Sequence, residues 1–211
     1  MNLALFYDTE TQSLPLFSEP SEHPGQPHIV QIAAILADLD TERTIASMDV
    51  IIRPDGWSIP DDVARIHGIT TDHAMTVGIP EEMALDMFME LWAGRLRIAH
   101  NETFDARIIR IALKRYHDPR DQTLAIHPSD MWKVSSSECT ARMATPILNL
   151  PPTEKMLASG RRHAKTANLG EAYQYFSGKP LENAHSAVAD VQACMFIYFA
   201  MRKAAQIAED V

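Results

Sequence analysis

Three apolar runs lie within the first 53 residues, and they constrain the fold more than any other feature. They cover residues 3–8, 29–39 and 45–53, and no helical pattern separates them. Each has the length and character of a buried strand, so their succession predicts an antiparallel meander. Residues 13–28 hold four prolines and a glycine, which predicts a loop between the first two strands.

Helical patterns dominate the remainder of the chain. Pro80 followed by two acids predicts a helix start, and we expect Met83, Met87 and Leu91 to form that helix's apolar stripe, with Ala84 and Phe88 beside it. The segment 117–138 has no clear period and is expected to be irregular. The other expected elements are a strand at 96–99 and helices at 60–68, 103–116, 140–145, 168–177 and 186–207. Strands followed by alternating helices predict an α/β fold, a mixed sheet flanked by helices, in a single domain over residues 1–211.

The composition is that of an ordinary globular protein, 46% hydrophobic and 22% charged. Cys139 and Cys194 have no metal-ligand spacing, which favours reduced thiols. The chain begins without a basic leader and contains no apolar run of the ~20 residues that a membrane helix needs, so we expect a cytoplasmic protein without a membrane partner. A net charge of −9 argues against non-specific nucleic-acid binding, unless bound cations supply the positive charge that a phosphate meets.

Five polar residues fall where this architecture places strand and helix ends. Asp8 and Glu10 follow the first strand at a spacing of two, which points both side chains to one face. Asp105 lies in the first turn of the helix that follows the 96–99 strand, a junction where α/β folds place ligands. Asp190 lies in the first turns of the last helix, and His185 precedes that helix.

These residue types suit phosphodiester hydrolysis. The reaction needs an activated water and a stabilised leaving oxygen, and two hard cations roughly 3.5–4 Å apart supply both. Mg²⁺ and Mn²⁺ prefer oxygen ligands, which explains a cluster of Asp and Glu rather than Cys. A histidine titrates near neutral pH, so it suits the removal of a proton from the attacking water.

Three ordered motifs carry a family resemblance. They are residues 6–11 (Phe-Tyr-Asp-Thr-Glu-Thr), 99–105 (Ala-His-Asn-Glu-Thr-Phe-Asp) and 185–190 (His-Ser-Ala-Val-Ala-Asp), with His-Gly-Ile-Thr at 67–70 as support. The chain resembles the DnaQ-like (DEDDh) 3′→5′ exonucleases, and the resemblance covers nearly the whole chain. It implies a ribonuclease H-like mixed five-stranded sheet and an enzyme that releases nucleoside monophosphates from a free 3′ end.

The resemblance also implies residue roles. Asp8 would bridge two divalent cations, Glu10 and Asp190 would complete the tighter site, and Asp105 would serve the second cation. His185 would be the general base. The substrate-binding residues implied are Thr9, Thr11, His67, Asn101 and Phe104. The long loop at 13–28 departs from the family's short turn and leaves base and strand preference open.

Several alternatives remain at this stage. Each acid alone could be a solvated strand end or a helix N-terminal acid, and His67 could simply belong to a helix end. The basic cluster at 161–165 is either a solvated loop or a phosphate clamp. Competing functions are a non-catalytic module that binds nucleic acid or a polymerase, and a phosphohydrolase of small nucleotides. We expect an unpaired single-stranded substrate, and a homodimer or a polymerase partner stays open.

Overall fold

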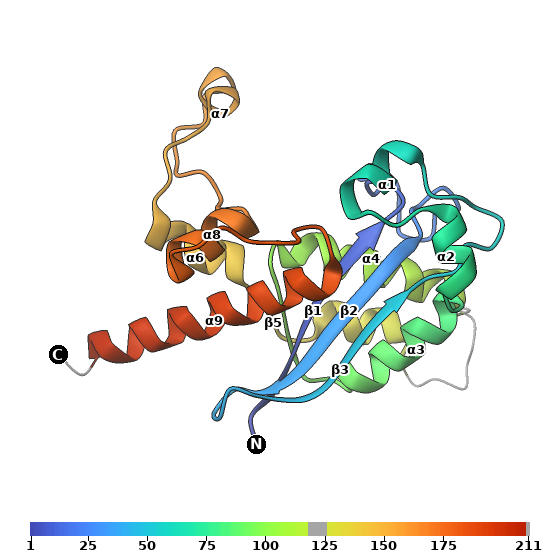
Figure 1. Cartoon of the computed structure of the whole chain (residues 1–211), viewed down its shortest axis with the longest axis horizontal. Coiled ribbons are helices and arrows are strands. Elements are labelled where there is room, and N and C mark those ends of the chain that lie inside the picture. Colours follow the sequence, from blue (N-terminus) through green and yellow to red (C-terminus); the bar gives the residue numbers. More distant parts are fainter. Residues whose placement is uncertain (118–125, 210–211) are drawn as a thin grey trace.

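A computed structural model describes residues 1–117 and 126–209 of the chain. Its centre is a mixed five-stranded sheet in the order β3-β2-β1-β4-β5 (Figure 1). The first three strands form the expected antiparallel meander, whereas β4 and β5 run parallel to β1 and to each other. The strands are β1 (Leu3–Thr11), β2 (Ile29–Asp38), β3 (Arg43–Ile51), β4 (Leu96–Ala99) and β5 (Ser137–Cys139).

Helices cover both faces of this sheet (Figure 1). They are α1 (Asp61–His67), α2 (Thr71–Val77), α3 (Glu81–Trp92), α4 (Glu102–Tyr116), α5 (Pro128–Val134), α6 (Thr140–Leu148), α7 (Glu154–Ala158), α8 (Leu169–Ser177) and α9 (Ala187–Glu209). Local sequence explains several ends: Asn168 and Glu171 form a capping box at α8, and Gly68 ends α1 in a left-handed conformation. The predicted fold class is therefore confirmed.

The central strand β1 is buried on both faces, which explains its continuous apolar sequence. Its side chains alternate, so Leu5 and Tyr7 pack in the core beneath α3 and α4, whereas Ala4 and Phe6 pack against α9. The Phe6 ring meets the Tyr198 ring of α9 edge-on, with 5.4 Å between centroids. This alternation decides which helix each polar residue at the end of β1 can face.

The helices α4 and α9 each bury an apolar face: Ile108, Ile109, Ala112 and Leu113 are buried on α4, and Val191 and Tyr198 of α9 lie in the core. Cys139 and Cys194 are both free and buried. Within the described residues, no helix is long and apolar enough to cross a bilayer.

The predicted stripe of α3 is wrong for Met83 and Met87, whereas Ala84 and Phe88, expected beside it, are buried. Met83 and Met87 are exposed at 53% and 45%, and the buried side chains are Ala84, Leu85, Phe88 and Trp92. The sheet meets a stripe one position further along the helix, because Phe88 and Trp92 pack around Trp132 of α5.

The segment 117–138 is not irregular throughout: α5 and β5 lie within it, whereas residues 118–125 lie outside the described part. The helices α2 and α7 were also missed. The α7 segment stands away from the sheet and its helices (Figure 1). It carries few buried side chains, so its sequence lacks the apolar period on which a helix prediction depends.

Candidate active site

The end of β1 places two carboxylates on the side of the sheet that α9 covers. Asp8 pairs with Ala33 of β2, and Glu10 pairs with Gln31. Since side chains alternate along a strand, Asp8 and Glu10 continue the row of Ala4 and Phe6 that faces α9.

Asp105 approaches the same strand end from the opposite helix layer. It lies in the first turn of α4, directly after β4, and its side chain is only 3% exposed. Its Oδ1 atom accepts two hydrogen bonds from Thr9, at 3.0 Å from the backbone nitrogen and 2.8 Å from the hydroxyl. Thr9 therefore fixes the position of the Asp105 carboxylate.

The start of α9 supplies Asp190 and His185. The His185 backbone N–H donates to Asp190 Oδ2 at 3.2 Å, and His185 has a φ of +68°, which turns the chain just before the helix. The Ala187 N–H donates to Gln31 Oε1 at 3.2 Å, which ties the beginning of α9 to β2. His185 itself is exposed, so its ring is free to meet a substrate.

These segments bring three predicted site residues together. Ligand atoms of Glu10, His185 and Asp190 all lie within 4.8 Å of one another. Asp8 is not a member of that tight group, but its carboxyl is near enough to Asp105, Asp190 and Glu10 for their charges to perturb it. Residues far apart in sequence thus converge on the end of β1.

The carboxyl groups of this cluster resist ionisation in the absence of a cation. Burial, then repulsion from Asp105, Asp190 and Glu10, raises the pKa of Asp8 well above its usual range. Burial and the neighbouring acids raise the pKa of Glu10 to about 8. Burial raises the pKa of Asp105 to about 7, against the lowering effect of its hydrogen bonds from Thr9. Burial also raises the pKa of Asp190.

Two features of the cluster suit divalent cations: the chemistry of its donor atoms and a buried oxygen that lacks a hydrogen-bond partner among the described residues. The cluster's carboxylate oxygens are the donors that Mg²⁺ and Mn²⁺ prefer. Asp190 Oδ1 is buried and has no hydrogen-bond partner in the part of the chain that the structure describes. A buried acceptor without a partner is costly, and a bound cation would remove that cost.

The exonuclease family model RNase_T, described as Exonuclease, matches residues 5–198. The chain belongs to this exonuclease family. No curated protein sequence matches the chain. The 3′→5′ direction, the cations and the role of His185 are expectations that this match leaves open.

Solved structures of exonuclease I share the fold of this exonuclease-family chain. E. coli Exonuclease I in complex with a dT13 oligonucleotide is 20% identical, with a TM-score of 0.70 over 100% of this chain and 43% of that chain. A zinc-bound E. coli complex with single-stranded DNA (20%, TM-score 0.66) and a moderately thermophilic Exonuclease I from Methylocaldum szegediense (20%, 0.67) each align with 96% of this chain and 41% of theirs. The chain thus spans less than half the length of these relatives, and the single-domain expectation stays a prediction.

The residues expected to bind substrate differ in burial and in whether their polar groups are already hydrogen-bonded. Thr9 is buried, and its polar groups are occupied by Asp105. The Thr11 hydroxyl donates to the Ser13 carbonyl at 2.9 Å. Asn101 is exposed at a φ of +64°, and Phe104 is half-buried against the core. Their contact with a substrate stays a prediction.

His67 combines a structural bond with an unused atom. Its Nδ1 accepts from the Ile69 N–H at 3.1 Å, which fits the helix-end alternative. Its Nε2 is buried without a partner among the described residues. Burial, and then repulsion from His185, lowers the pKa of His67, so the two histidines share one environment.

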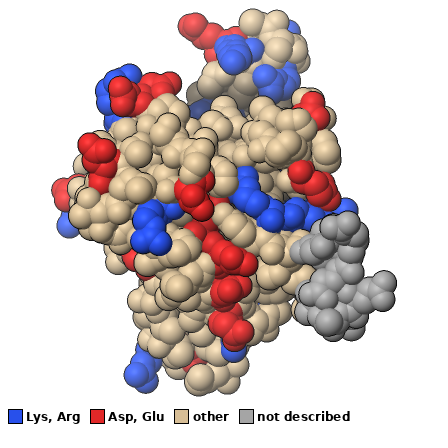
Figure 2. Space-filling model, turned by 90° about the vertical axis from the view of Figure 1, so that its right-hand side faces the viewer, with Lys and Arg blue, Asp and Glu red and all other residues tan. Residues whose placement is uncertain are grey.

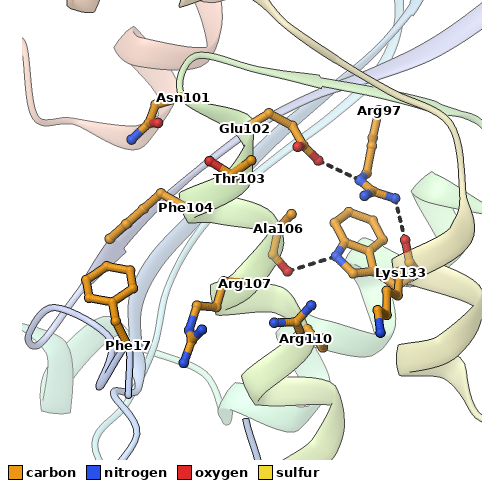
Figure 3. A pocket seen from close by; sticks show the side chains of 11 residues that line it. Phe17, Arg97, Asn101, Glu102, Thr103, Phe104, Ala106, Arg107, Arg110 and Lys133 are labelled. Carbon is orange, nitrogen blue, oxygen red and sulfur yellow. Dashed lines mark hydrogen bonds and ion pairs between the residues drawn. The ribbon is translucent and has the colours of Figure 1, made fainter. Parts of the chain in front are cut away.

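Sequence reasoning did not predict the cavity beside the cluster. Phe17 of the 13–28 loop, Arg107 and Arg110 of α4 and Lys133 of α5 line it together with Asn101 and Phe104 (Figure 3). Two arginines spaced by three residues on one helix face could have signalled it, but the contributions of the loop and α5 could not be foreseen. Figure 2 shows basic side chains beside a column of acidic ones on one face of the molecule, so positive charge is local on this acidic chain.

Proposed function

We propose that the protein is a metal-dependent 3′→5′ exonuclease that removes nucleoside monophosphates from a single-stranded end. The observation that carries this proposal is the approach of Glu10, His185 and Asp190 to within 4.8 Å of one another at the end of β1. Asp8 and Asp105 lie beside them with raised pKa values, as expected of carboxylates gathered closely enough to share a cation. Membership of the exonuclease family supports the same reaction.

Two divalent cations, Mg²⁺ or Mn²⁺, would be held by the four carboxylates. Asp8 would bridge them, Glu10 and Asp190 would complete one site, and Asp105 would serve the other. Cations at these positions would activate a water and stabilise the leaving oxygen of the phosphodiester.

The side chains around the cations have separate tasks. His185 is exposed at the rim of the cluster, and its ring accepts the proton of the attacking water. The hydrogen bond from its backbone N–H to the Asp190 carboxylate holds the two residues in a fixed relative position. Thr9 orients Asp105, and Asn101, Phe104 and His67 line the place for the terminal sugar and base.

The substrate class is proposed from two considerations. The exonuclease I structures that share this fold were solved with single-stranded oligonucleotides such as dT13, which supports a strand with unpaired bases. Half-buried Phe104 offers such a base a ring to stack on. Both DNA and RNA meet these requirements.

The deciding experiment uses 5′-labelled single-stranded DNA and RNA with Mg²⁺, with Mn²⁺ and with EDTA. We expect a metal-dependent ladder that shortens from the 3′ end, absent in Asp8→Ala and present in Asp86→Ala, an exposed carboxylate on α3. Cleavage of free nucleotides alone would instead favour the phosphohydrolase. Binding without cleavage of any substrate would favour the non-catalytic module.

A further inference from the structure

A cavity of ≈ 570 Å³ lies along α4, next to the carboxylate cluster but not part of it. We call it the Phe17 groove, and Figure 3 shows its walls. Its volume is within the roughly 300–1,000 Å³ of ordinary ligand pockets. The side chains used below are Phe17, Phe104, Arg107, Arg110, Trp132 and Lys133.

The Phe17 groove is positively charged although the chain carries a net charge of −9. At its floor, Arg97 is buried, pairs with Glu102 at 2.9 Å and lies over the Trp132 ring, so this pair is neutral. Arg107, Arg110 and Lys133 add positive charge, and among the described residues the lining holds no second carboxylate. Local positive charge on an acidic protein indicates an anionic ligand.

Aromatic surface accompanies this charge. Phe17 is 65% exposed, so its ring is open to a ligand. The Arg107 guanidinium lies 5.4 Å from the centre of its ring, and half-buried Phe104 forms part of the same wall. Alternating rings and cations are the pattern that single-stranded nucleic acid requires, because bases stack and phosphates need positive partners.

The loop that carries Phe17 is held in place by α4. Arg107 Nη2 donates to the carbonyls of Leu16 and Glu19, both at 2.8 Å, and Arg110 Nε donates to the Ser21 hydroxyl at 3.1 Å. Arg107 Nε is buried and has no partner among residues 1–117 and 126–209. The groove is therefore formed before a ligand arrives and retains an unused donor.

We propose that the Phe17 groove binds the nucleotides directly upstream of the 3′-terminal one, with a base on Phe17 and backbone phosphates on Arg110 and Lys133. This inference rests on the proposed function and extends it. The groove shares Asn101 and Phe104 with the place expected for the terminal nucleotide, and Asp105 follows Phe104 on α4. A strand that leaves the cluster along α4 meets the groove next.

The test compares two substrates on the full chain with its cation. One is an oligothymidylate or oligouridylate, whichever the protein degrades. The other is the p-nitrophenyl ester of the matching nucleoside 5′-monophosphate, which has no upstream nucleotide. Phe17→Ala and Arg110→Gln should each lower the oligonucleotide-to-ester ratio of kcat/KM about tenfold. Lys203 is an exposed cation on α9 that pairs with Glu42, and Lys203→Gln should leave this ratio unchanged.

Salt dependence separates the two kinds of contact. Arg110→Gln should reduce the slope of log KM against log salt for the oligonucleotide by about 0.7, the value for one phosphate contact on a single strand. Phe17→Ala should keep the wild-type slope, because stacking releases no counterion. An unchanged ratio in both variants, with wild type active on both substrates, would overturn the groove assignment alone. A wild type inert on both substrates would overturn the proposed function and the groove with it.

Discussion

Thr9 donates two hydrogen bonds to the same oxygen of Asp105, from its backbone nitrogen at 3.0 Å and from its hydroxyl at 2.8 Å. This links the central strand to the first turn of α4. Both bonds lower the pKa of Asp105, whereas burial raises it to about 7. A cation needs Asp105 in its ionised state, and this state therefore depends on Thr9, which bears no charge.

Replacing Thr9 with valine tests this link. Thr9→Val keeps the shape and the backbone N–H but removes the hydroxyl bond, so the Asp105 pKa should rise further and protons should compete better with the cation. We expect the half-saturating Mn²⁺ concentration to rise about tenfold, since a hydrogen bond to a charged group contributes about 1.5–3 kcal/mol. Thr76→Val, which loses a hydroxyl bond to the Asp72 carbonyl on α2, is the matched control. Equal metal titrations in both variants would contradict the role of Thr9.

Metal-free protein should lose stability as the pH rises. The folded-state pKa values of Glu10 (about 8) and Asp105 (about 7) lie above ordinary carboxyl values, so the folded state binds more protons than the unfolded state. Their stabilising protonation is complete below about pH 4 and is lost as the pH rises through about 7 and then 8. Urea unfolding in EDTA should give a free energy lower by on the order of 1–3 kcal/mol at about pH 9 than at about pH 6. Mn²⁺ should remove most of that difference, and a pH-independent value in EDTA would count against the cluster.

Asp8 is the residue whose loss should separate activity from stability. Asp8→Ala should abolish cleavage, while the metal-free protein stays folded or gains stability near pH 8, because carboxylate repulsion is relieved. Thermal unfolding in EDTA and the ladder assay in Mg²⁺ measure the two effects. A metal-free variant that melts well below wild type would show that Asp8 has a structural role instead.

The sheet was predictable from the sequence because a buried strand is recognised from the apolar character of its own residues. Runs such as residues 29–38 are buried along their whole length, and apolar continuity reports this directly. The prediction misplaced the centre of the α3 stripe, because Met83 and Phe88 are both apolar and the sequence does not say which of them faces Trp132. The strand β5 is three residues long, too short to carry a period.

The candidate site was predictable to the extent that its residues belong to ordered motifs. Glu10, His185 and Asp190 do converge, as their motifs suggested. The bond from Thr9 to Asp105 was not foreseeable, because it depends on how α4 docks against β1. The Phe17 groove was missed for the same reason, since its walls come from three segments that only the fold brings together.

His185 should affect turnover more than binding. His185→Ala should reduce kcat by roughly 10²–10⁴-fold with little change in KM, if its ring takes the proton of the attacking water. Because His185 has a φ of +68°, His185→Asn is the better companion variant, since asparagine tolerates this backbone and also lacks the base. Both variants should lose rate alike. A rise in KM that matches the loss of rate would make His185 a substrate contact instead.

Glu81 should be essential for stability and not for chemistry. Its side chain is 4% exposed and accepts hydrogen bonds from His28 at 2.6 Å, the Ile29 N–H at 2.9 Å, Arg115 at 3.2 Å and the Tyr116 hydroxyl at 2.8 Å. Although burial opposes ionisation, the bond from His28 and the charge of Arg115 lower the pKa of Glu81. Glu81→Gln should therefore cost about 3 kcal/mol and lower Tm by roughly 6–12 °C.

The free energy of unfolding at low pH gives the Glu81 prediction a second readout. A depressed folded-state pKa contributes stability that is present above the ordinary glutamate value and lost as the pH falls through the lower folded value. Wild type should thus lose the Glu81 contribution below about pH 4, and the difference from Glu81→Gln should narrow there. Exposed Glu82→Gln on the same helix should change neither Tm nor the free energy of unfolding at low pH. Since Glu81 is not a member of the Glu10, His185 and Asp190 group, kcat per folded Glu81→Gln molecule should equal that of wild type. A loss of kcat would tie this ion-pair network to the active site.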